Sequence, residues 1–345
     1  MRDAVITVPS YYSQEKREMM IQAADLAGLK VEQLVHENTA AATMYGIDRM
    51  DSEKDLHVLY YNMGATDTEV SVVRYSAVTD GKTDKTHEYV EIMGEAYDET
   101  LGGKEFDHVL VGILADEFNA MKERQGKPDI RENKRAMRRL YKEIGKTKDV
   151  LSANKITDVK VSELADYVTL FFKLERETFE EKSAHLFERV KKPIESALAQ
   201  AGLTAEQIDQ VEILGGGLRV PKVQEIIKET MNTEELHVHL NGDEAMCFGS
   251  AFIASNSSSS FKVRKVYLTQ HPQFSYKIEI SPMEPVDQAQ LSTEEETEDG
   301  EKPMAYEKDA ILYKRSDYLG QKKTISISYD RAMKIEVYAL KDIEG

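Results

Sequence analysis

Residues 60–75 constrain the fold more than any other part of the chain. Two apolar runs with high β-strand propensity flank a short turn at Gly64-Ala65-Thr66. Such a turn at a strand end presents backbone N–H groups to a phosphate. Asn62 stands at the mouth of the turn, and its amide can orient an ion or a water but can neither take up a proton nor supply negative charge. The segment therefore predicts a sheet that holds a nucleotide and is poorly equipped to hydrolyse it.

Length and charge limit the classes of protein to consider. With 345 residues the chain exceeds the usual size of a single core, so we expect two or more domains. The net charge of −17 argues against nucleic acid or an anionic membrane surface as the main partner. No apolar stretch is long enough to span a bilayer, and no signal peptide precedes the strand-like residues 4–8, which suggests a fragment. The single cysteine, Cys247, is expected to be packed.

Hydrophobic periodicity divides the chain into an α/β part and a β-rich part. Ser13 predicts the N-cap of a helix that Gly28 ends. Strand and helix patterns then alternate up to about residue 256. Residues 256–260 have the composition of a flexible linker. Beyond the linker, the acidic segment 284–309 predicts disorder, and alternating apolar and polar residues predict strands at 274–280, 323–328 and 334–340.

A second glycine-rich turn follows another apolar run. Residues 211–214 lead into Gly215-Gly216-Gly217, and a helix is expected after Pro221. Glycines let a ribose or a base approach the backbone closely, and Arg219 can lie against a flat base or pair with a phosphate. Taken alone, the glycine cluster fits a tight strand-to-helix turn equally well.

Several motifs in combination resemble one family. From residue 4 to about residue 260 their order and spacing are similar to those of the heat-shock-seventy chaperones. The β-rich tail resembles the start of that family's substrate-binding β-sandwich. The motifs are residues 4–12 (AVITVPSYY), 37–46 (ENTAAATMYG), the turn at 64–66, 101–107 (LGGKEFD), 131–137 (RENKRAM) and the triple glycine.

The resemblance implies an α/β chain with an actin-like or sugar-kinase-like ATPase domain, followed by the start of an all-β sandwich. Lobe I is expected to be incomplete and lobe II complete, because the family's first phosphate loop, catalytic lysine and one subdomain would lie upstream of Met1. The implied domains are a nucleotide-binding domain (1–256), a linker (257–264) and a partial substrate-binding β-domain (265–345) with an acidic insertion at 284–309. Within the first domain, the implied parts are the remainder of lobe I (1–54), lobe IIA (55–101 and 184–244), lobe IIB (102–183) and a closing helix (245–256).

The resemblance also implies a site for ATP or ADP, with Mg²⁺ as an optional companion and no residue assigned as a metal ligand. Glu37 matches the acidic residue near the metal and the attacking water, which makes it a weak catalytic candidate. The phosphates would lie near Gly64, Ala65 and Thr66. The adenosine would lie at Gly215, Gly216, Gly217 and Arg219, with Asp243 nearby, and the second lobe would contribute Gly103, Lys148 and Ser152.

This chain departs from the family at the positions closest to the chemistry. Asn62 replaces the carboxylate that helps to hold metal and water. Ala65 and Thr66 replace glycines, Asp149 stands in place of an arginine and Gly145 in place of a glutamate. Degraded phosphate turns are typical of the family's large, divergent branch. Within it, residues 131–137, 150–154 and 261–263 look most like the hypoxia-up-regulated, glucose-regulated chaperones of the endoplasmic reticulum (ER) lumen.

The leading hypothesis is an ATP-binding chaperone or cochaperone of the ER lumen. It would drive nucleotide exchange on a heat-shock-seventy partner and hold unfolded polypeptide clients, without nucleic acid and without membrane insertion. One alternative is an ATP-hydrolysing chaperone in which Asp67 or Glu69 supplies the missing carboxylate. A second alternative is a sugar-kinase or actin-like relative, against which the β-rich tail after a serine linker argues.

Overall fold

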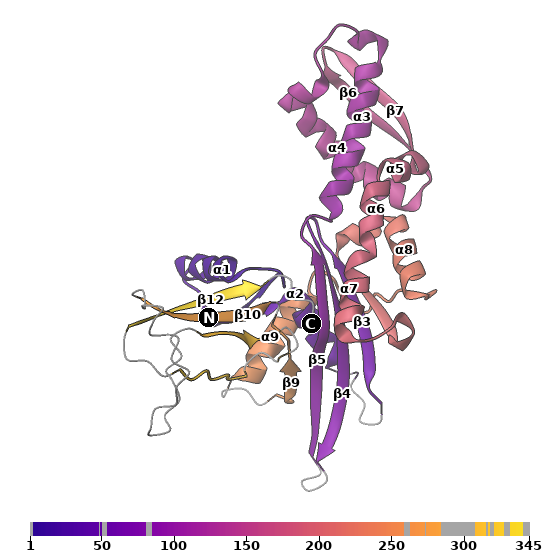
Figure 1. The fold of residues 1–345 in the computed structure, drawn as a ribbon. Helices are drawn as coiled ribbons and strands as arrows, with labels where there is room; N and C mark the ends of the chain where they lie inside the picture. The colour runs from indigo at the N-terminus through magenta and orange to yellow at the C-terminus, as the bar shows by residue number, and fades with distance from the viewer. Residues whose placement is uncertain are drawn as a thin grey trace, which may run out of the picture. The chain divides into compact units, whose positions relative to one another are not determined.

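The computed structural model describes residues 3–47, 49, 54–80, 85–258, 263–272, 274–283, 308–314, 317, 321–327 and 332–340. The chain forms two compact units, Met1–Leu268 and Thr269–Gly345 (Figure 1). The boundary lies a few residues beyond the linker expected at 257–264. The first unit contains every residue of the predicted nucleotide site.

A five-stranded sheet lies at the centre of the first unit. β3 pairs with β4 in antiparallel and with β8 in parallel orientation, and β4 pairs with β5 in antiparallel orientation. β9 adds to the free edge of β5, although the sequence analysis assigned its residues to the next domain. The strands are β3 (Leu56–Met63), β4 (Thr68–Asp80), β5 (Lys85–Asp98), β8 (Gln210–Leu214) and β9 (Val266–Thr269).

Helices cover both faces of this sheet, which explains why β3 reads as one continuous apolar run. Alternate residues of β3 join different cores. Leu59 and Tyr61 pack in the core that includes α7 (Lys192–Ala201), whereas Val58 and Tyr60 pack with Tyr45 of α2 (Glu37–Gly46). Figure 1 shows α7 beside the sheet on one side, with α2 and α9 (Ala245–Ser257) on the other.

A β-α-β unit precedes α2. β1 (Asp3–Val8) and β2 (Lys30–His36) pair in parallel, and α1 (Gln14–Leu26) connects them. As the sequence predicts, Ser13 caps α1 by accepting from the Lys16 backbone N–H at 3.3 Å, and Gly28 follows the helix with a positive φ of 78°. β2 continues directly into α2, so the side chains of His36 and Glu37 lie at that junction.

A helical part projects from the sheet after β5. The hairpin of β6 and β7 packs with α3 and α4 through Leu140, Ile144, Val159 and Leu170 (Figure 1). The elements are α3 (Gly103–Ala120), α4 (Lys134–Ala153), β6 (Ile156–Ala165), β7 (Val168–Glu175), α5 (Arg176–Lys182), α6 (Ala184–Val190) and α8 (Pro221–Met231). Short 3₁₀ turns occupy Lys122–Arg124, Ile130–Glu132, Ala205–Gln207 and Gly216–Arg219.

The second unit contains a three-stranded antiparallel sheet with β10 (Ser275–Pro282) between β11 (Lys308–Tyr313) and β12 (Met333–Leu340). The strand expected at 323–328 is wrong over its described residues. Residues 321–327 have no strand assignment, and Lys323 instead pairs with Asp317 at 2.6 Å. Of the acidic segment 284–309, residues 284–307 lie outside the described residues, and the last two belong to β11.

Cys247 is exposed rather than packed. The buried face of α9 carries Ala245, Gly249 and Ile253, and position 247 points away from that face.

Within the described ranges, no helix has both the length and the apolar character needed to cross a bilayer.

Candidate functional site

Three backbone segments meet at one end of the five-stranded sheet. They are the turn at 64–66 between β3 and β4, the N-terminus of α3, and the loop after β8. The Gly103 N–H donates to the Gly64 carbonyl at 3.0 Å, and the Lys104 N–H donates to the Ala65 carbonyl at 2.8 Å. Two N–H groups that a helix N-terminus leaves without helical partners therefore bind the turn and fix its position.

Glycines make this meeting possible. A Cβ atom on Gly102 would lie 2.6 Å from backbone atoms of Ala65 and Thr66. Gly215 has a φ of +92°, and its Cβ would lie 2.3 Å from the Met63 carbonyl oxygen. These glycines are needed because the chain crosses itself, and for Gly215 this agrees with the tight strand-to-helix turn that the sequence fits as well as it fits a ligand contact.

The central glycine of the triple is different. Gly216 is exposed, and a Cβ atom there would meet nothing within 4 Å, whereas one on Gly217 would lie 2.4 Å from Met63 Cγ. Gly216 is therefore the member of the triple that faces open space and could receive a ligand.

Polar side chains from α4 and from the 3₁₀ turn at Gly216–Arg219 surround these segments. Lys148 Nζ lies 3.1 Å from the Gly103 carbonyl and 2.6 Å from Asp107 Oδ1. Arg219 lies 3.7 Å from Asp149 Oδ1, and both side chains are largely exposed. The structure thus brings Lys148 and Gly103 into contact and sets Arg219 at the outer edge.

Two other predicted residues lie next to this group without contacting the turn. Ser152 Oγ donates to the Asp149 carbonyl at 2.7 Å, one helical turn along α4. Asp243 is exposed and follows Gly242, whose Cβ would lie 3.6 Å from the Gly215 nitrogen. Both residues lie near the glycine loop. Among the described interactions, neither side chain makes a contact that directs it toward the turn.

Carboxyl groups gather on the α2 side of the turn. The Asn62 side chain is buried, and its Nδ2 lies 3.5 Å from Glu37 Oε2. Burial, followed by the charge of Asp67, raises the pKa of Glu37, although the Asn62 hydrogen bond lowers it. Asp67 accepts from the Tyr11 hydroxyl at 2.9 Å, and its carbonyl accepts from the Gly64 N–H. Asn62 therefore holds a carboxyl group rather than supplying one.

Glu69 lies directly opposite Asn62 in the β3–β4 ladder and is 1% exposed. Its Oε2 accepts from the Ser10 N–H at 3.1 Å. Burial, and then the charge of Glu37, raises the pKa of Glu69 to about 8, even though the Ser10 hydrogen bond lowers it. The shift therefore favours the neutral form of this carboxyl group over the ionised form.

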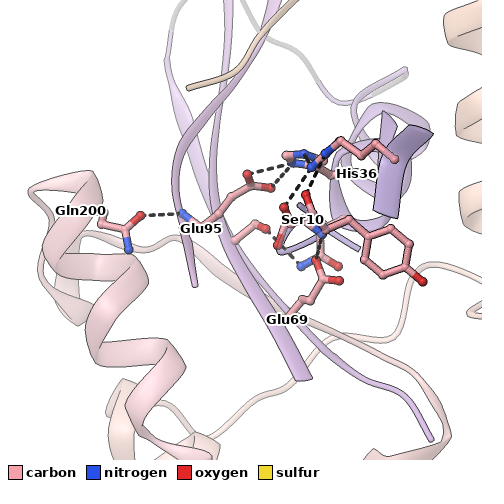
Figure 2. Close-up of polar contacts among 9 residues, drawn as sticks. Ser10, His36, Glu69, Glu95 and Gln200 are labelled. Carbon is pink, nitrogen blue, oxygen red and sulfur yellow. Dashed lines mark hydrogen bonds and ion pairs between the residues drawn. The ribbon is translucent and has the colours of Figure 1, made fainter. Parts of the chain in front are cut away.

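A buried polar network continues from Ser10 toward β5 (Figure 2). His36 Nδ1 lies 3.0 Å from Glu95 Oε2, and Arg17 lies 3.0 Å from His36 Nε2 while also donating to the Ser10 carbonyl. From the other face of the sheet, Gln200 accepts from the Glu95 N–H at 3.3 Å. The sequence analysis missed this network. The available signal was weak, because Glu95 stands in a strand that also carries Glu88, Glu91 and Asp98, so a charged residue there is not conspicuous.

Among the described residues, the carboxyl groups near the turn do not assemble into a metal-binding group. Across the described ranges, no group of three or more His, Cys, Asp or Glu side chains could hold a metal ion. The two carboxyl groups nearest the turn are engaged by Asn62 and Tyr11, and burial raises the pKa of the third, Glu69.

Comparison with known proteins decides the family. The profile of the family described as "Hsp70 protein" matches residues 1–297. The chain belongs to the Hsp70 family. The α/β architecture together with this match confirms the expected actin-like fold class of the Hsp70 ATPase domain.

Similar proteins support the expected branch of the Hsp70 family. Hypoxia up-regulated protein 1 of Xenopus laevis is 37% identical over 333 residues, which is 95% of this chain and 49% of that protein. The Danio rerio protein of that name is also 37% identical over 333 residues, covering 95% of this chain and 32% of the relative. The Homo sapiens protein is 40% identical over 269 residues, covering 76% and 26%. The chain therefore spans between a quarter and a half of the length of these relatives, and the resemblance to the hypoxia-up-regulated branch is confirmed.

Proposed function

We propose that this Hsp70-family chain binds adenine nucleotide without rapid hydrolysis and serves as a cochaperone in the ER lumen. In this role it promotes nucleotide exchange on a heat-shock-seventy partner and takes part in holding unfolded polypeptides. The observation that carries the proposal is the contact of the Asn62 amide with Glu37, whose atoms lie 3.5 Å apart next to the buried Glu69. An amide in this position cannot supply the charge that phosphoryl transfer needs.

The residues fit a nucleotide. The turn at 64–66 and the Lys148 ammonium would hold the phosphates, since α3 directs its positive end at the turn and Lys148 lies against Gly103. The adenosine would lie along Gly216, the triple-glycine residue that faces open space, with Arg219 available to stack on the base. Asp243 and Ser152 border this position.

The residues do not fit a hydrolytic Mg²⁺ centre. Hsp70 proteins in general bind nucleotide with Mg²⁺. In this chain Asn62 offers a neutral amide where a carboxylate is expected, and burial raises the pKa of the neighbouring Glu37. We therefore derive no catalytic step through a metal ion. Asp67 is the remaining support for an ATP-hydrolysing chaperone, because its carboxyl group lies at the turn.

The compartment and the partner are inferred from the resemblance of the sequence motifs to the hypoxia-up-regulated branch. The name of these relatives, hypoxia up-regulated protein 1, is that of a stress-induced protein, and the family match makes the chain a chaperone relative. Because the chain spans less than half of each relative, exchange activity and client binding remain proposals for the chain itself.

Stopped-flow release of a fluorescent ADP analogue from an ER heat-shock-seventy chaperone tests the exchange activity. We expect the 345-residue chain to accelerate release, and an unchanged rate would contradict the proposal. Single-turnover hydrolysis of ATP by the same chain tests the alternative. We expect a rate equal to that of buffer, and a clear burst would favour the ATP-hydrolysing chaperone.

A further inference from the structure

Glu212 places a carboxyl group in the middle of β8, a short and otherwise mostly apolar strand. Its side chain is fully buried, and its partner across the ladder is Tyr60, which packs in the same core as Tyr45 and Leu240. A buried carboxyl group lowers stability unless hydrogen bonds compensate it, and an apolar side chain of similar size would fill the space at less cost. We therefore expect Glu212 to have a role other than packing.

Glu212 is hydrogen-bonded to one loop, defined here as residues 237–243. Its Oε1 accepts from the backbone N–H groups of His239 at 2.6 Å and of Leu240 at 2.9 Å. Its Oε2 lies 2.9 Å from His239 Nδ1. Because a carboxylate offers only acceptors, His239 Nδ1 carries the ring proton and donates it. Two backbone donors and one side-chain donor therefore fasten the 237–243 loop to β8.

The start of the loop runs alongside the same strand. The His237 N–H donates to the Val211 carbonyl at 2.8 Å, and the His237 carbonyl accepts from the Ile213 N–H at 2.9 Å. These bonds place His237 beside Glu212 in parallel orientation. The rings of His237 and His239 stack, with their centroids 5.1 Å apart and their planes 14° from parallel. The stacking restricts the His239 ring and so helps to keep its Nδ1 directed at Glu212.

The end of the loop borders the triple glycine. A Cβ atom on Gly242 would lie 3.6 Å from the Gly215 nitrogen, which is an ordinary contact distance. Asn241 fixes the exit of the chain into α9, because its carbonyl accepts from the Ala245 N–H at 2.8 Å and its Oδ1 accepts from the Asp243 N–H at 3.1 Å. The loop is thus a wall beside the glycine turn, held at its start by β8 and at its end by α9.

We propose that Glu212 is a positioning residue for the adenosine side of the nucleotide site. By fastening the 237–243 loop, it sets the distance of Gly242 from the triple glycine and thus the width of the space that Gly216 faces. An unfastened loop would have to be ordered by each nucleotide that binds, which lowers affinity. The inference rests on the proposed nucleotide binding. It concerns the adenosine alone, because α3 fixes the phosphate turn at 64–66 without the loop.

Two measurements on Glu212→Met test the proposal. Methionine keeps a long, unbranched side chain and removes both acceptor oxygens. We expect hydrogen–deuterium exchange of the amides in residues 237–243 to become at least about tenfold faster than in wild type. In calorimetric titrations, the affinity for ATP should fall about tenfold, whereas the affinity for inorganic tripolyphosphate should change less than about twofold. A purely structural role would leave the ratio of these two affinities as it is in wild type.

Glu212→Gln should restore most of the behaviour of wild type. Glutamine keeps one oxygen, which can still accept from the backbone N–H groups of His239 and Leu240. We expect its loop exchange and its ATP affinity to lie within about threefold of the wild-type values. A Glu212→Gln variant as impaired as Glu212→Met would contradict fastening through these backbone bonds.

Asp209→Ala is the matched control. Asp209 precedes β8 at the end away from the glycines, and its carboxylate also accepts from a backbone N–H, that of His57, at 2.9 Å. Its removal should leave both the exchange of the loop and the ratio of the two affinities at wild-type values. An unchanged ratio in Glu212→Met, or an equal change in Asp209→Ala, overturns the proposal.

Two further outcomes are decisive. If the wild-type chain binds no ATP, the proposed function fails and the role toward adenosine fails with it, whereas wild-type ATP binding with an unchanged ratio in Glu212→Met overturns the role of Glu212 alone. Should Glu212→Met not fold, residue-resolved exchange of the wild-type chain decides. The amides of His239 and Leu240 must then be as protected as those of β8, and rapid exchange at either amide overturns the proposal.

Discussion

His36 and Glu95 form a buried pair that joins the end of β2 to β5. His36 Nδ1 lies 3.0 Å and 3.2 Å from the two carboxylate oxygens of Glu95, and both side chains are less than a tenth exposed. Arg17 approaches the other ring nitrogen, Nε2, at 3.0 Å. Because a guanidinium group has only donors, Nε2 accepts, and Nδ1 therefore carries the ring proton and donates to Glu95. The pair fixes both the tautomer of His36 and its orientation.

Removing the acceptor from this pair should destabilise the first unit strongly. Glu95→Ala leaves the His36 N–H buried and takes a negative charge away from the neighbourhood of Arg17. We expect a loss of about 3 kcal/mol in the free energy of unfolding, measured by urea denaturation. Glu117→Ala, an exposed glutamate on α3, should change it by less than about 0.5 kcal/mol. Equal effects of the two substitutions would contradict a structural role for the pair.

Local pattern predicted the elements around this pair but not the pair itself. The strand at β1, the cap at Ser13 and the stop at Gly28 each depend on a few consecutive residues, and all are present. His36 and Glu95 are separated by 59 positions, and nothing in the periodicity of either segment indicates its partner. A charged residue in a buried strand could have been noted as unusual, but its partner is determined by tertiary packing.

Gly102 should be nearly irreplaceable. A Cβ atom there would lie 2.6 Å from backbone atoms of Ala65 and Thr66, and backbone cannot move aside as a side-chain end can. Gly102→Ala should therefore displace α3 from the turn, lower the free energy of unfolding by roughly 2 kcal/mol and weaken ATP binding at least tenfold. Isothermal titration calorimetry and denaturant unfolding measure these effects.

Gly216→Ala is the matched control for Gly102, because a Cβ atom at 216 meets nothing within 4 Å. Its stability should be close to that of wild type. Nucleotide affinity should nevertheless fall if Gly216 lies against the adenosine. Should Gly102→Ala instead match wild type in both measurements, the close contact between α3 and the turn would not be required.

Asn62→Asp tests the interpretation of the turn as deficient in negative charge. The new carboxyl group would lie beside Glu37 and opposite Glu69, so three acidic side chains would be crowded together and each further negative charge would cost stability. We expect a loss of roughly 1–3 kcal/mol of stability in the presence of EDTA, and recovery on addition of Mg²⁺ that wild type does not show. Thermal unfolding with EDTA and with MgCl₂ gives the comparison.

Asn154→Asp controls for the substitution at Asn62, since Asn154 is exposed at the end of α4. It should respond to Mg²⁺ as wild type does. A Mg²⁺ response in wild type as large as that in Asn62→Asp would show that the missing carboxylate is supplied by another residue, and it would favour the ATP-hydrolysing alternative.

The sequence predicted the residues of the candidate site where its glycine turns and charged residues follow the order of the Hsp70-family motifs. That order led to Gly103, Lys148 and the triple glycine, which do gather at one end of the sheet. The exact contact was not predictable, because a sequence does not reveal that a Cβ atom on Gly215 would lie 2.3 Å from the Met63 carbonyl oxygen. The raised pKa of Glu69 was equally hidden, since it depends on burial and on Glu37.

Asp98 and Arg189 provide an acid-sensitive contact between β5 and α6. Two nitrogens of Arg189 lie 2.9 Å and 2.6 Å from the carboxylate oxygens, and the Thr100 N–H donates at 3.1 Å. Burial alone would raise the pKa of Asp98, but the hydrogen bonds from Arg189 and Thr100 and the charge of Arg189 lower it overall. The contact therefore adds stability above the pKa of an unfolded aspartate, and this stability is lost as pH falls through the lowered folded value.

Comparison of Asp98→Asn with wild type should make this dependence visible. At pH 7 we expect the variant to be less stable by about 2 kcal/mol, because paired hydrogen bonds to a charged group are lost. The difference should shrink once the pH falls below about 4. Asp116→Asn removes a similar partner from Arg131, but that pair is largely exposed and should cost less than about 1 kcal/mol at any pH. Urea unfolding from pH 3 to pH 7 measures both, and a difference for Asp98→Asn that does not vary with pH would contradict the assignment.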